Sequence, residues 1–439
     1  MAEAHWFQEF STARAVPVRT AVLLKDAGDG DSSTFHLRRE GGHSRAVWNN
    51  FLSAFLPEGY PSSVTPDYLP FQTWDTLQGL STYIRSMLST QALLGGIGVG
   101  ATTATVVGAT FQWFLRDFTG MLGSILFTLK QGSNLDSSAK QWRLAADLMN
   151  DIGMLMDLVS PLFPGAFVMI LCIGSMARSV TGVASGATRA ALTQHFALRK
   201  NAADVSAKEG SQETAATMVG MLLGMILARL TAGNVVALWV SFLLLTAFHM
   251  YANYRAVRSL CLTSLNGERA SILLRAFKEG RRVPTPREVA DQEHLLPQIP
   301  RLPWQKQRVG DAWLPKSIRF GAPISSLKLA DGWKSFPSLV ERYSKDPYLV
   351  VPEGANVHVV LHKVATPQDF LRAYVHALCL ADLQARAPSD QSEEVAISWM
   401  QKNYTAFLDS LGKSGWATDR ILVVSSEWRA EWINMHKRE

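Results

Sequence analysis

The chain has 439 residues, of which 47% are hydrophobic and only 18% are charged, and its formal net charge is +6. Soluble domains average roughly 25% charged residues, so the low share disfavours an entirely soluble chain. A nucleic-acid-binding chain of this length would carry more clustered basic charge, so nucleic-acid binding is also disfavoured. The three cysteines, Cys172, Cys261 and Cys379, are too widely spaced to predict a disulfide framework or a zinc site.

Residues 1–56 are predicted to form a peripheral N-terminal segment. The first ten residues contain two glutamates and lack an apolar core, so we expect no secretory signal there. The next segment contains four prolines: Pro57, Pro61, Pro66 and Pro70. Because proline interrupts helices, we expect an extended, aromatic-rich lead into the first apolar run.

Long stretches without charged residues predict membrane helices between residues 57 and 260. Asp, Glu, Lys and Arg are absent between Arg85 and Arg116, between Asp157 and Arg178, and between Arg229 and Arg255. A span of roughly 20 residues crosses a bilayer core. The expected helices lie near 86–110, 111–130, 141–160, 165–198, 203–229 and 232–254. The predicted fold is mainly α: a membrane-embedded bundle of four to six helices, followed by a small soluble α+β domain.

Small residues recur at helical spacing in three of these segments. The stripes are Gly96, Gly100, Ala104 and Gly108; Gly174, Gly182 and Gly186; and Gly220, Gly224 and Ala228. On a helix such a stripe lets a neighbouring backbone approach closely, as in packed transmembrane helices. In water the glycines would weaken a helix by up to about 1 kcal/mol each, which favours a lipid environment.

After Tyr254 the chain becomes basic and then rich in proline. Residues 261–316 are predicted to be a linker, and their excess of Arg and Lys places this end on the cytosolic or equivalent side of the membrane. Residues 317–439 are predicted to form the soluble α+β domain, with strands at 348–351, 357–364 and 421–424. Two helices are expected, one starting at Thr366 and Pro367 and one carrying Ile397 to Leu411.

Several sequence blocks occur in this order: YPSSVTPDYLPFQTWD, FQWFLRDFTGMLGSILF, LDSSAKQWRLAADLMND, SPLFP, GATRAALTQHFA and NAADVSAKEGSQET. They resemble the signature blocks of the Root UVB Sensitive (RUS) family, closely over residues 51–275 and loosely beyond. The resemblance implies roles in the UV-B response, vitamin B6 homeostasis and auxin distribution, and for some members a plastid location. It implies no settled biochemical activity. Phe118 departs from the small residue that the family usually has before Thr119 and Gly120, which puts a tight turn there in question.

Ionisable residues in apolar surroundings are candidates for a ligand site, because they are costly at membrane depth unless they are paired or used. Arg116 and Asp117 either exchange partners with neighbouring helices or form a solvated turn. Arg143 and Asp147 lie on one face of a predicted helix, with Asp151 one turn further, and this face either lines a cavity or faces water. Arg178 lies in the row of the second small-residue stripe.

The polar block at 185–214 provides the remaining candidates. Asn201 is expected to cap a helix, with Asp204 in the reciprocal position and Lys208 one turn later. In the functional interpretation, Arg189, His195 and Lys208 bind an anionic group and are balanced by Asp204 and Glu209. The alternative is a charged loop and helix cap exposed at one membrane face.

The sequence predicts no metal site, no catalytic residues and no enzyme activity, and it leaves any cofactor unknown. His358 and His362 share one side of a predicted strand, which we interpret as a solvent-facing pair, and His249 is expected to satisfy a local hydrogen bond. Degenerate nucleotide-binding patterns at Gly96 and at Gly412 lack the required context.

Two functions remain open from the sequence. The first is an integral membrane protein that binds or transports a small anionic metabolite, with the lipid bilayer as its surroundings. The second is a membrane-anchored scaffold whose C-terminal domain recruits a family member or another protein. The organelle, plastid or another endomembrane compartment, is left open.

Overall fold

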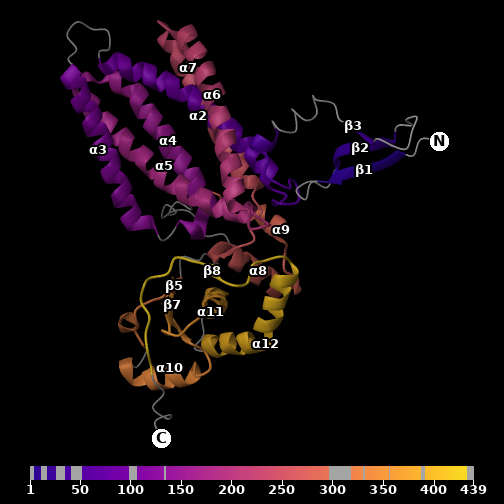
Figure 1. Ribbon diagram of the computed structural model, residues 1–439. Helices are drawn as coiled ribbons and strands as arrows, with labels where there is room; N and C mark the ends of the chain where they lie inside the picture. Colours follow the sequence, from indigo (N-terminus) through magenta and orange to yellow (C-terminus); the bar gives the residue numbers. More distant parts are fainter. Residues whose placement is uncertain are drawn as a thin grey trace. The chain divides into compact units, whose positions relative to one another are not determined.

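The computed structural model describes most of the chain (Figure 1). Backbone alone is described for the strands at 4–10, 17–25 and 35–40. Backbone and side chains are described over 52–97 (except the side chain of 97), 106–132 (except the side chains of 106 and 109), 135–295, 318–329, 332–354, 356–386 and 391–432. The chain divides into two compact units, one of residues 1–125 and 145–260 and one of residues 126–144 and 261–439.

Long helices dominate the first unit. Their bounds are α2 (Tyr68–Ile97), α3 (Val106–Gln131), α4 (Ala139–Val159), α5 (Phe167–Phe196), α6 (Ala202–Thr231) and α7 (Val235–Ser259), with 3₁₀ turns η3 (Ser160–Leu162) and η4 (Pro164–Ala166) between α4 and α5. The end of α3 and the start of α4 belong to the second unit. Near the N-terminus, β1 (Ala4–Phe10), β2 (Pro17–Lys25) and β3 (Phe35–Glu40) form an antiparallel sheet in the order β1-β2-β3.

The helix α2 begins earlier than its sequence suggests. The prediction of an extended lead up to the apolar run was wrong, because residues 68–85 are already helical. Pro70 is the third residue of α2, where its missing N–H leaves no helical hydrogen bond unmade. Tyr68 and Phe71 are buried, so tertiary packing stabilises this polar first half.

Glycine brings α6 into close contact with α2. A Cβ atom at Gly220 would lie 2.7 Å from the Cβ of Tyr83, and one at Gly224 would lie 2.7 Å from the Cγ of Met87. These distances are too short for any larger side chain without movement. The small-residue stripe on α6 therefore functions as predicted: Gly220 and Gly224 form a seam, the α2–α6 seam, at which the two helix backbones approach closely.

The other two stripes are used only in part. A Cβ at Gly174 would meet Met156, and one at Gly96 would meet Phe167, whereas Gly182 and Gly186 have open space around them. Positions 100 and 104 lie outside the described residues. Spacing alone therefore did not identify which glycines make helix contacts.

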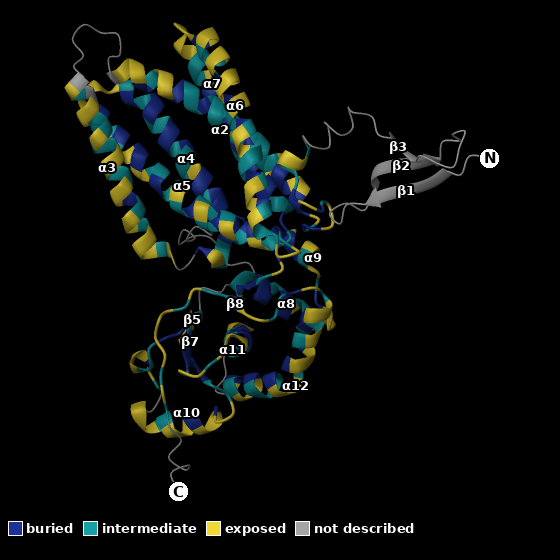
Figure 2. Cartoon of the chain, viewed as in Figure 1, coloured by how far each residue is buried: buried dark blue, intermediate teal, exposed yellow. Residues whose placement is uncertain are grey.

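Many residues on the long helices of this unit are exposed (Figure 2), and a large number of these exposed residues carry large apolar side chains. Examples with more than half of their surface exposed are Ile125, Leu222, Leu230 and Leu244. Three helical segments in the described residues, 164–196, 202–231 and 235–259, are long and apolar enough to cross a membrane. In their most apolar windows only 17%, 22% and 17% of the residues are buried within the chain. A lipid environment would cover the rest.

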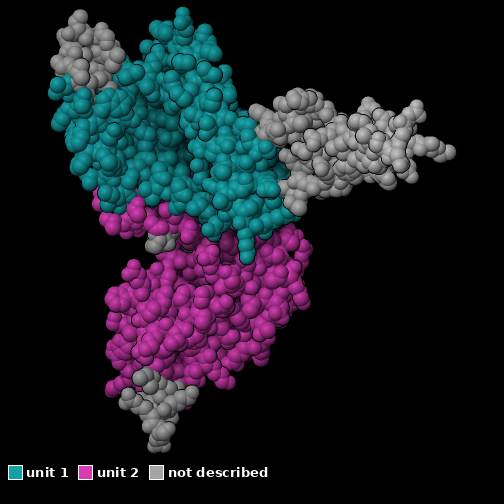
Figure 3. Space-filling model, viewed as in Figure 1, with its two compact units in different colours: residues 1–125, 145–260 teal, residues 126–144, 261–439 magenta. Residues whose placement is uncertain are grey.

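The second unit, magenta in Figure 3, is a small α+β fold with its own core. Its helices are α8 (Gly267–Gly280), α9 (Pro286–Ala290), α10 (Phe336–Arg342), α11 (Pro367–Arg386) and α12 (Ser392–Lys413). Its strands are β4 (Leu265–Asn266), β5 (Ile318–Phe320), β6 (Tyr348–Glu353), β7 (Asn356–Leu361) and β8 (Ile421–Leu422). Its 3₁₀ turns are η2 (Asp136–Ser138), η7 (Ile324–Ser326) and η8 (Gly332–Ser335).

The central strand of this unit is β7. It pairs in parallel with β5 and antiparallel with β6, giving the sheet order β5-β7-β6. The helix α11 supplies buried residues to the same core, including Leu371, Val375 and Leu378. At its start the Thr366 hydroxyl accepts a hydrogen bond from the Asp369 N–H, and the Asp369 carboxylate accepts one from the Thr366 N–H, so the helix begins where the sequence predicts.

The interpretation of His358 as solvent-facing was wrong, because it is only 2% exposed. Much of the expected linker, residues 296–317, lies outside the described residues. The mainly α fold with a smaller α+β region is confirmed.

Acid is expected to destabilise the second unit through His376. Burial lowers the pKa of this side chain from 6.5 to about 4, and Arg372 adds to the shift. Between these pH values the unfolded chain binds a proton that the folded core excludes, so the stabilisation is complete above about pH 6.5 and falls by up to about 3 kcal/mol as the pH approaches 4. Thermal unfolding between pH 7 and 5 should show this slope in the wild type. His376→Phe should flatten it, and the exposed control His294→Gln should not; equal slopes in all three would contradict the assignment.

Candidate functional site

A buried ionic network joins three helices of the first unit. Arg85 on α2 is fully buried and donates from Nη1 to Asp151 Oδ1 on α4 at 2.6 Å and to Thr246 Oγ1 on α7 at 3.1 Å. The Nδ1 atom of His249, also on α7, lies 3.0 Å from the other oxygen of Asp151. Its Nε2 lies 2.6 Å from the amide nitrogen of Gln78. Because an amide nitrogen only donates, the consistent arrangement has His249 accepting from Gln78 and donating to Asp151.

Helical spacing places these groups on inward faces. Gln78 and Arg85 are seven residues apart on α2, which is two turns. Thr246 and His249 are three residues apart on α7, so both side chains lie on one face of that helix. The network is therefore built from separate helices whose polar positions meet only after packing.

One donor in this network is unused. Among the described residues, Arg85 Nη2 is buried and has no hydrogen-bond acceptor. The Nε atom donates to the Ser81 carbonyl at 3.4 Å, and the guanidinium carbon lies 6.0 Å from the centre of the Phe242 ring. A buried donor without an acceptor costs about 1–3 kcal/mol, more for a charged group, so a bound anion at Nη2 would relieve that cost.

A second polar cluster lies between α2, α5 and α6. Glu209 is 8% exposed and accepts hydrogen bonds from Gln72 Nε2 at 2.8 Å and from Thr193 Oγ1 at 3.2 Å. His195 Nε2 lies 2.9 Å from Asp67 Oδ2. Each of these carboxylates therefore already has partners from other segments.

Each of the three predicted anion-binding residues in the polar block at 185–214 contacts a carboxylate. Arg189 contacts Glu213 at 2.6 Å, His195 contacts Asp67, and Lys208 contacts Asp204 at 3.8 Å. The three predicted anion-binding cations are therefore not brought together around one point; each has its own carboxylate.

Asn201 lies at the predicted N-cap position of α6, but the expected capping hydrogen bond was wrong. The Asn201 side chain makes no capping hydrogen bond to α6 and instead accepts from the Arg199 N–H at 3.2 Å. Asp204 accepts from the Glu58 N–H at 2.7 Å. The carboxylate thus ties the segment before α2 to the start of α6.

Arg116 and Asp117 lie inside α3, so the interpretation as a turn between helices was wrong. The Arg116 guanidinium lies 4.6 Å from the centre of the Trp113 ring, and Asp117 is exposed. Phe118 stacks on Phe114, with ring centres 5.7 Å apart. A large residue is tolerated at 118 because the backbone there is helical.

The remaining candidates are held in the interior. Arg178 on α5 contacts Asp157 on α4 with two hydrogen bonds of 2.7 and 3.3 Å. Arg143 and Asp147 are 7% and 6% exposed, so the water-facing alternative for this side of α4 does not hold. Within the described ranges, no cluster of three or more His, Cys, Asp or Glu could hold a metal ion.

Sequence reasoning missed most of the network around Arg85. Arg85 appeared only as the boundary of a charge-free run, and Asp151 only as a member of the polar face of α4. His249 was expected to bond locally, yet its partners Asp151 and Gln78 are 98 and 171 residues away in sequence. The available signal was a histidine within an apolar helix, which requires a polar partner.

These features define a helical-bundle protein with three candidate membrane spans among its described residues, a buried charge network and a C-terminal α+β unit. Residues 41–281 match a family model described as vitamin B6 photo-protection and homoeostasis domain, and residues 282–432 match one described as Root UVB sensitive protein, C-terminal. The chain belongs to the Root UVB sensitive family.

Curated relatives include proteins of a plant and an amoeba. The chain is 56% identical to protein root UVB sensitive 3 of Arabidopsis thaliana, over 94% of this chain and 93% of that protein. It is 46% identical to RUS family member 1 of Dictyostelium discoideum, over 58% of this chain and 49% of the relative. It is 30% identical to protein root UVB sensitive 2, chloroplastic, of Arabidopsis thaliana, over 85% of this chain and 83% of that protein. No solved structure matches the chain.

Proposed function

We propose that this protein is an integral membrane protein that binds a small anionic metabolite within its helical bundle, at Arg85, and carries it across the membrane. The observation that supports this most is the buried guanidinium with an unused Nη2 donor. The outer surface is apolar, so a charge at this depth is expensive unless it serves a ligand or an ion.

The network is suited to switching between two states. Asp151 and Thr246 hold one nitrogen of Arg85, Nη1, by hydrogen bonds. A ligand anion that contacts Nη2 adds a second negative charge near the guanidinium, while His249 and Gln78 stabilise Asp151 from the other side. Binding that changes how strongly Asp151 holds Arg85 would couple the ligand to the packing of α2, α4 and α7.

The family description suggests the first ligand class to test, the vitamin B6 compounds. Pyridoxine 5′-phosphate carries a phosphate anion and no reactive aldehyde, so it binds without forming a Schiff base with lysines. We further propose roles in UV-B response and auxin distribution and a membrane of a plastid or another endomembrane compartment, with the C-terminal unit on the cytosolic or equivalent side.

Arg85→Lys is the decisive variant for this proposal. It keeps a positive charge for Asp151 but removes the second nitrogen of the planar fork, so folding should persist while the anion loses its donor. We expect pyridoxine 5′-phosphate binding to the full-length protein in lipid nanodiscs, measured by titration calorimetry, to weaken about tenfold or more. The melting temperature should stay close to that of the wild type.

Arg189→Lys is the matched control, because that arginine forms a half-exposed pair with Glu213. Unchanged binding in this control and weakened binding in Arg85→Lys support the site. Loss of binding only in the control would move the site to the polar block at 185–214. Absence of any anion in the purified protein by native mass spectrometry, together with no binding, would contradict the proposal.

A second candidate function is a membrane-anchored scaffold. It is favoured by the ion pairs of the polar block, which are satisfied without a ligand, and by the exposed side chains Trp333, Val364 and Trp428 on the second unit. Under this alternative, Arg85→Lys would leave metabolite handling unchanged, and Trp428→Ser would reduce recovery of a partner protein.

A further inference from the structure

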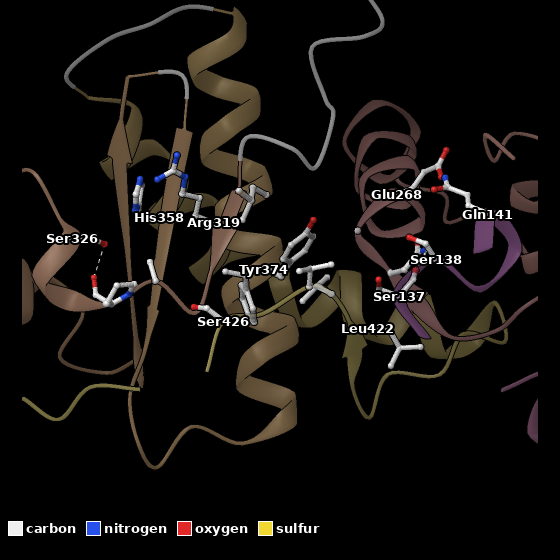
Figure 4. Close-up of a pocket in the computed structure, with 18 of the residues that line it drawn as sticks. Ser137, Ser138, Gln141, Glu268, Arg319, Ser326, His358, Tyr374, Leu422 and Ser426 are labelled. Carbon is white, nitrogen blue, oxygen red and sulfur yellow. Dashed lines mark hydrogen bonds between the residues drawn. The ribbon is translucent and has the colours of Figure 1, made fainter. Parts of the chain in front are cut away.

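The second unit contains a cavity of about 830 Å³ that is separate from the helical network (Figure 4). Its walls come from β5, β7, α11, the segment after β8, and the residues around the starts of α4 and α8. Small-molecule sites in proteins span about 300–1,000 Å³ and combine apolar walls with a few polar groups, so this cavity has the size and character of a ligand site.

A cationic side chain, Arg319, and a buried histidine, His358, lie side by side at one end of this cavity. Arg319 on β5 and His358 on β7 are partners in the parallel strand register, and both line the cavity. Arg319 is exposed, and it makes no ion pair within the described part of the chain. Figure 4 shows its side chain next to the His358 ring.

His358 is 2% exposed, and one of its two ring nitrogens is open to a ligand. Its Nε2 lies 2.9 Å from Glu353, a carboxylate that also pairs with Lys328. Its Nδ1 is buried without a hydrogen-bond partner among the described residues. Burial lowers the pKa of His358, which supports a neutral ring at pH 7. The positive charge at this end of the cavity is therefore that of Arg319.

The middle of the cavity is apolar and aromatic. Phe320 and Tyr374 contact each other edge to face, with ring centres 5.7 Å apart, and Leu422 and Val424 line the same space. Figure 4 places Tyr374 between the two polar ends. A ligand that fills this region needs an apolar body, and aromatic rings suit the edge-to-face geometry.

The opposite end of the cavity disfavours a second acidic group on the ligand. Glu268, in the first turn of α8, accepts hydrogen bonds from both the N–H and Nδ1 of His294, and Gln141 donates to the His294 carbonyl. Asn266 caps α8 there and also donates to the Ser137 carbonyl. This end presents one carboxylate and several amides and hydroxyls, so it suits neutral donors on a ligand.

We propose that this cavity binds a small organic anion with an aromatic body, oriented with its acidic group at Arg319 and its neutral end toward Glu268. The site lies wholly in the second unit and does not depend on the metabolite site proposed at Arg85. Carboxylates and phosphate monoesters share the chemistry that Arg319 recognises.

The test uses 2-naphthoate, an intrinsically fluorescent aromatic carboxylate, with the full-length protein in phosphatidylcholine nanodiscs and empty nanodiscs as the baseline. The uncharged analogue 2-naphthalenemethanol measures the contribution of charge, and 2-naphthyl phosphate compares the two acid classes. We expect saturable binding of 2-naphthoate and binding of the alcohol that is at least about tenfold weaker.

Two variants separate charge from shape. Arg319→Gln should weaken 2-naphthoate about tenfold without affecting the alcohol, while its control Arg420→Gln, an exposed arginine outside the cavity lining, should not. Val424→Trp should block both compounds by filling the cavity, while Val395→Trp, at an exposed position on α12 outside the lining, should block neither. Melting temperatures confirm that each variant is folded.

The outcomes are distinguishable from those for the bundle. Binding of 2-naphthoate that Arg85→Lys leaves intact and Arg319→Gln weakens supports this second site. Absence of saturable binding to the wild type at millimolar probe, or binding that both Arg319→Gln and Val424→Trp leave unchanged, overturns it.

Discussion

Replacing Asp151 with asparagine is expected to destabilise the helical bundle by about 3–5 kcal/mol, because it leaves the buried charge of Arg85 without its carboxylate. His249 also loses a charged acceptor, since its Nδ1 lies 3.0 Å from the second oxygen of Asp151. The expected result is a lower melting temperature in detergent and a smaller monodisperse peak on size exclusion.

Two further variants show whether the missing charge is the cause. Asp117→Asn changes an exposed carboxylate on α3 and should leave both measurements unchanged. The double variant Arg85→Met with Asp151→Leu removes both charges and should recover most of the stability, since buried ion pairs are often replaceable by apolar residues. If Asp151→Asn is as stable as the wild type, Arg85 has another counter-ion, and the network described here is not what holds it.

Substituting leucine at both Gly220 and Gly224 is expected to separate α6 from α2. At Gly220 a Cβ would lie 2.7 Å from the Cβ of Tyr83 and 3.1 Å from the carbonyl oxygen of Leu80, and a backbone atom cannot move aside as a flexible side chain can. Overpacking costs about 1–3 kcal/mol at each position. Because Gly220 and Gly224 both lie in the contact between α2 and α6, both substitutions act on that contact. The measurement is the melting temperature of the purified protein, together with cysteine crosslinking between α2 and α6.

Gly182→Leu provides the matched control, because it makes the same substitution on α5 where a Cβ would meet no atom within 4 Å. It should leave stability within about 0.5 kcal/mol of the wild type, as substitutions away from packed contacts usually do. An equal loss in this control and in the double variant would mean that leucine is unfavourable at any of these helical positions, and that the α2–α6 seam does not explain the effect.

The helical segments of the bundle were predictable because helix formation depends on local composition and periodicity. The segments expected near 141–160, 165–198 and 203–229 correspond to α4, α5 and α6 within a few residues. The start of α2 was missed because its first turns are polar and contain Pro70, and their helical state depends on tertiary packing.

The polar sites were only partly predictable. Arg178 was recognised as a candidate because a charged residue in an apolar stretch stands out in a sequence, and Glu209 because it lies in a polar block between two apolar stretches. Their partners were not, and the block at 185–214, which looked like one anion site, contains separate pairs with carboxylates on other segments. Side chains of opposite charge have many possible partners in a sequence, and only the packed backbone selects among them.

The sequence by itself determined the family, the mainly α bundle with its apolar outer faces, and the separate α+β region, because these follow from local pattern and from long matching blocks. The tertiary structure decided which charges meet. Arg85 and Asp151 are 66 residues apart, and His249 and Gln78 are 171 apart, so their contact depends on how whole helices pack. It also decided that Arg319 and His358 share a cavity, because strand pairing between β5 and β7 fixes their register.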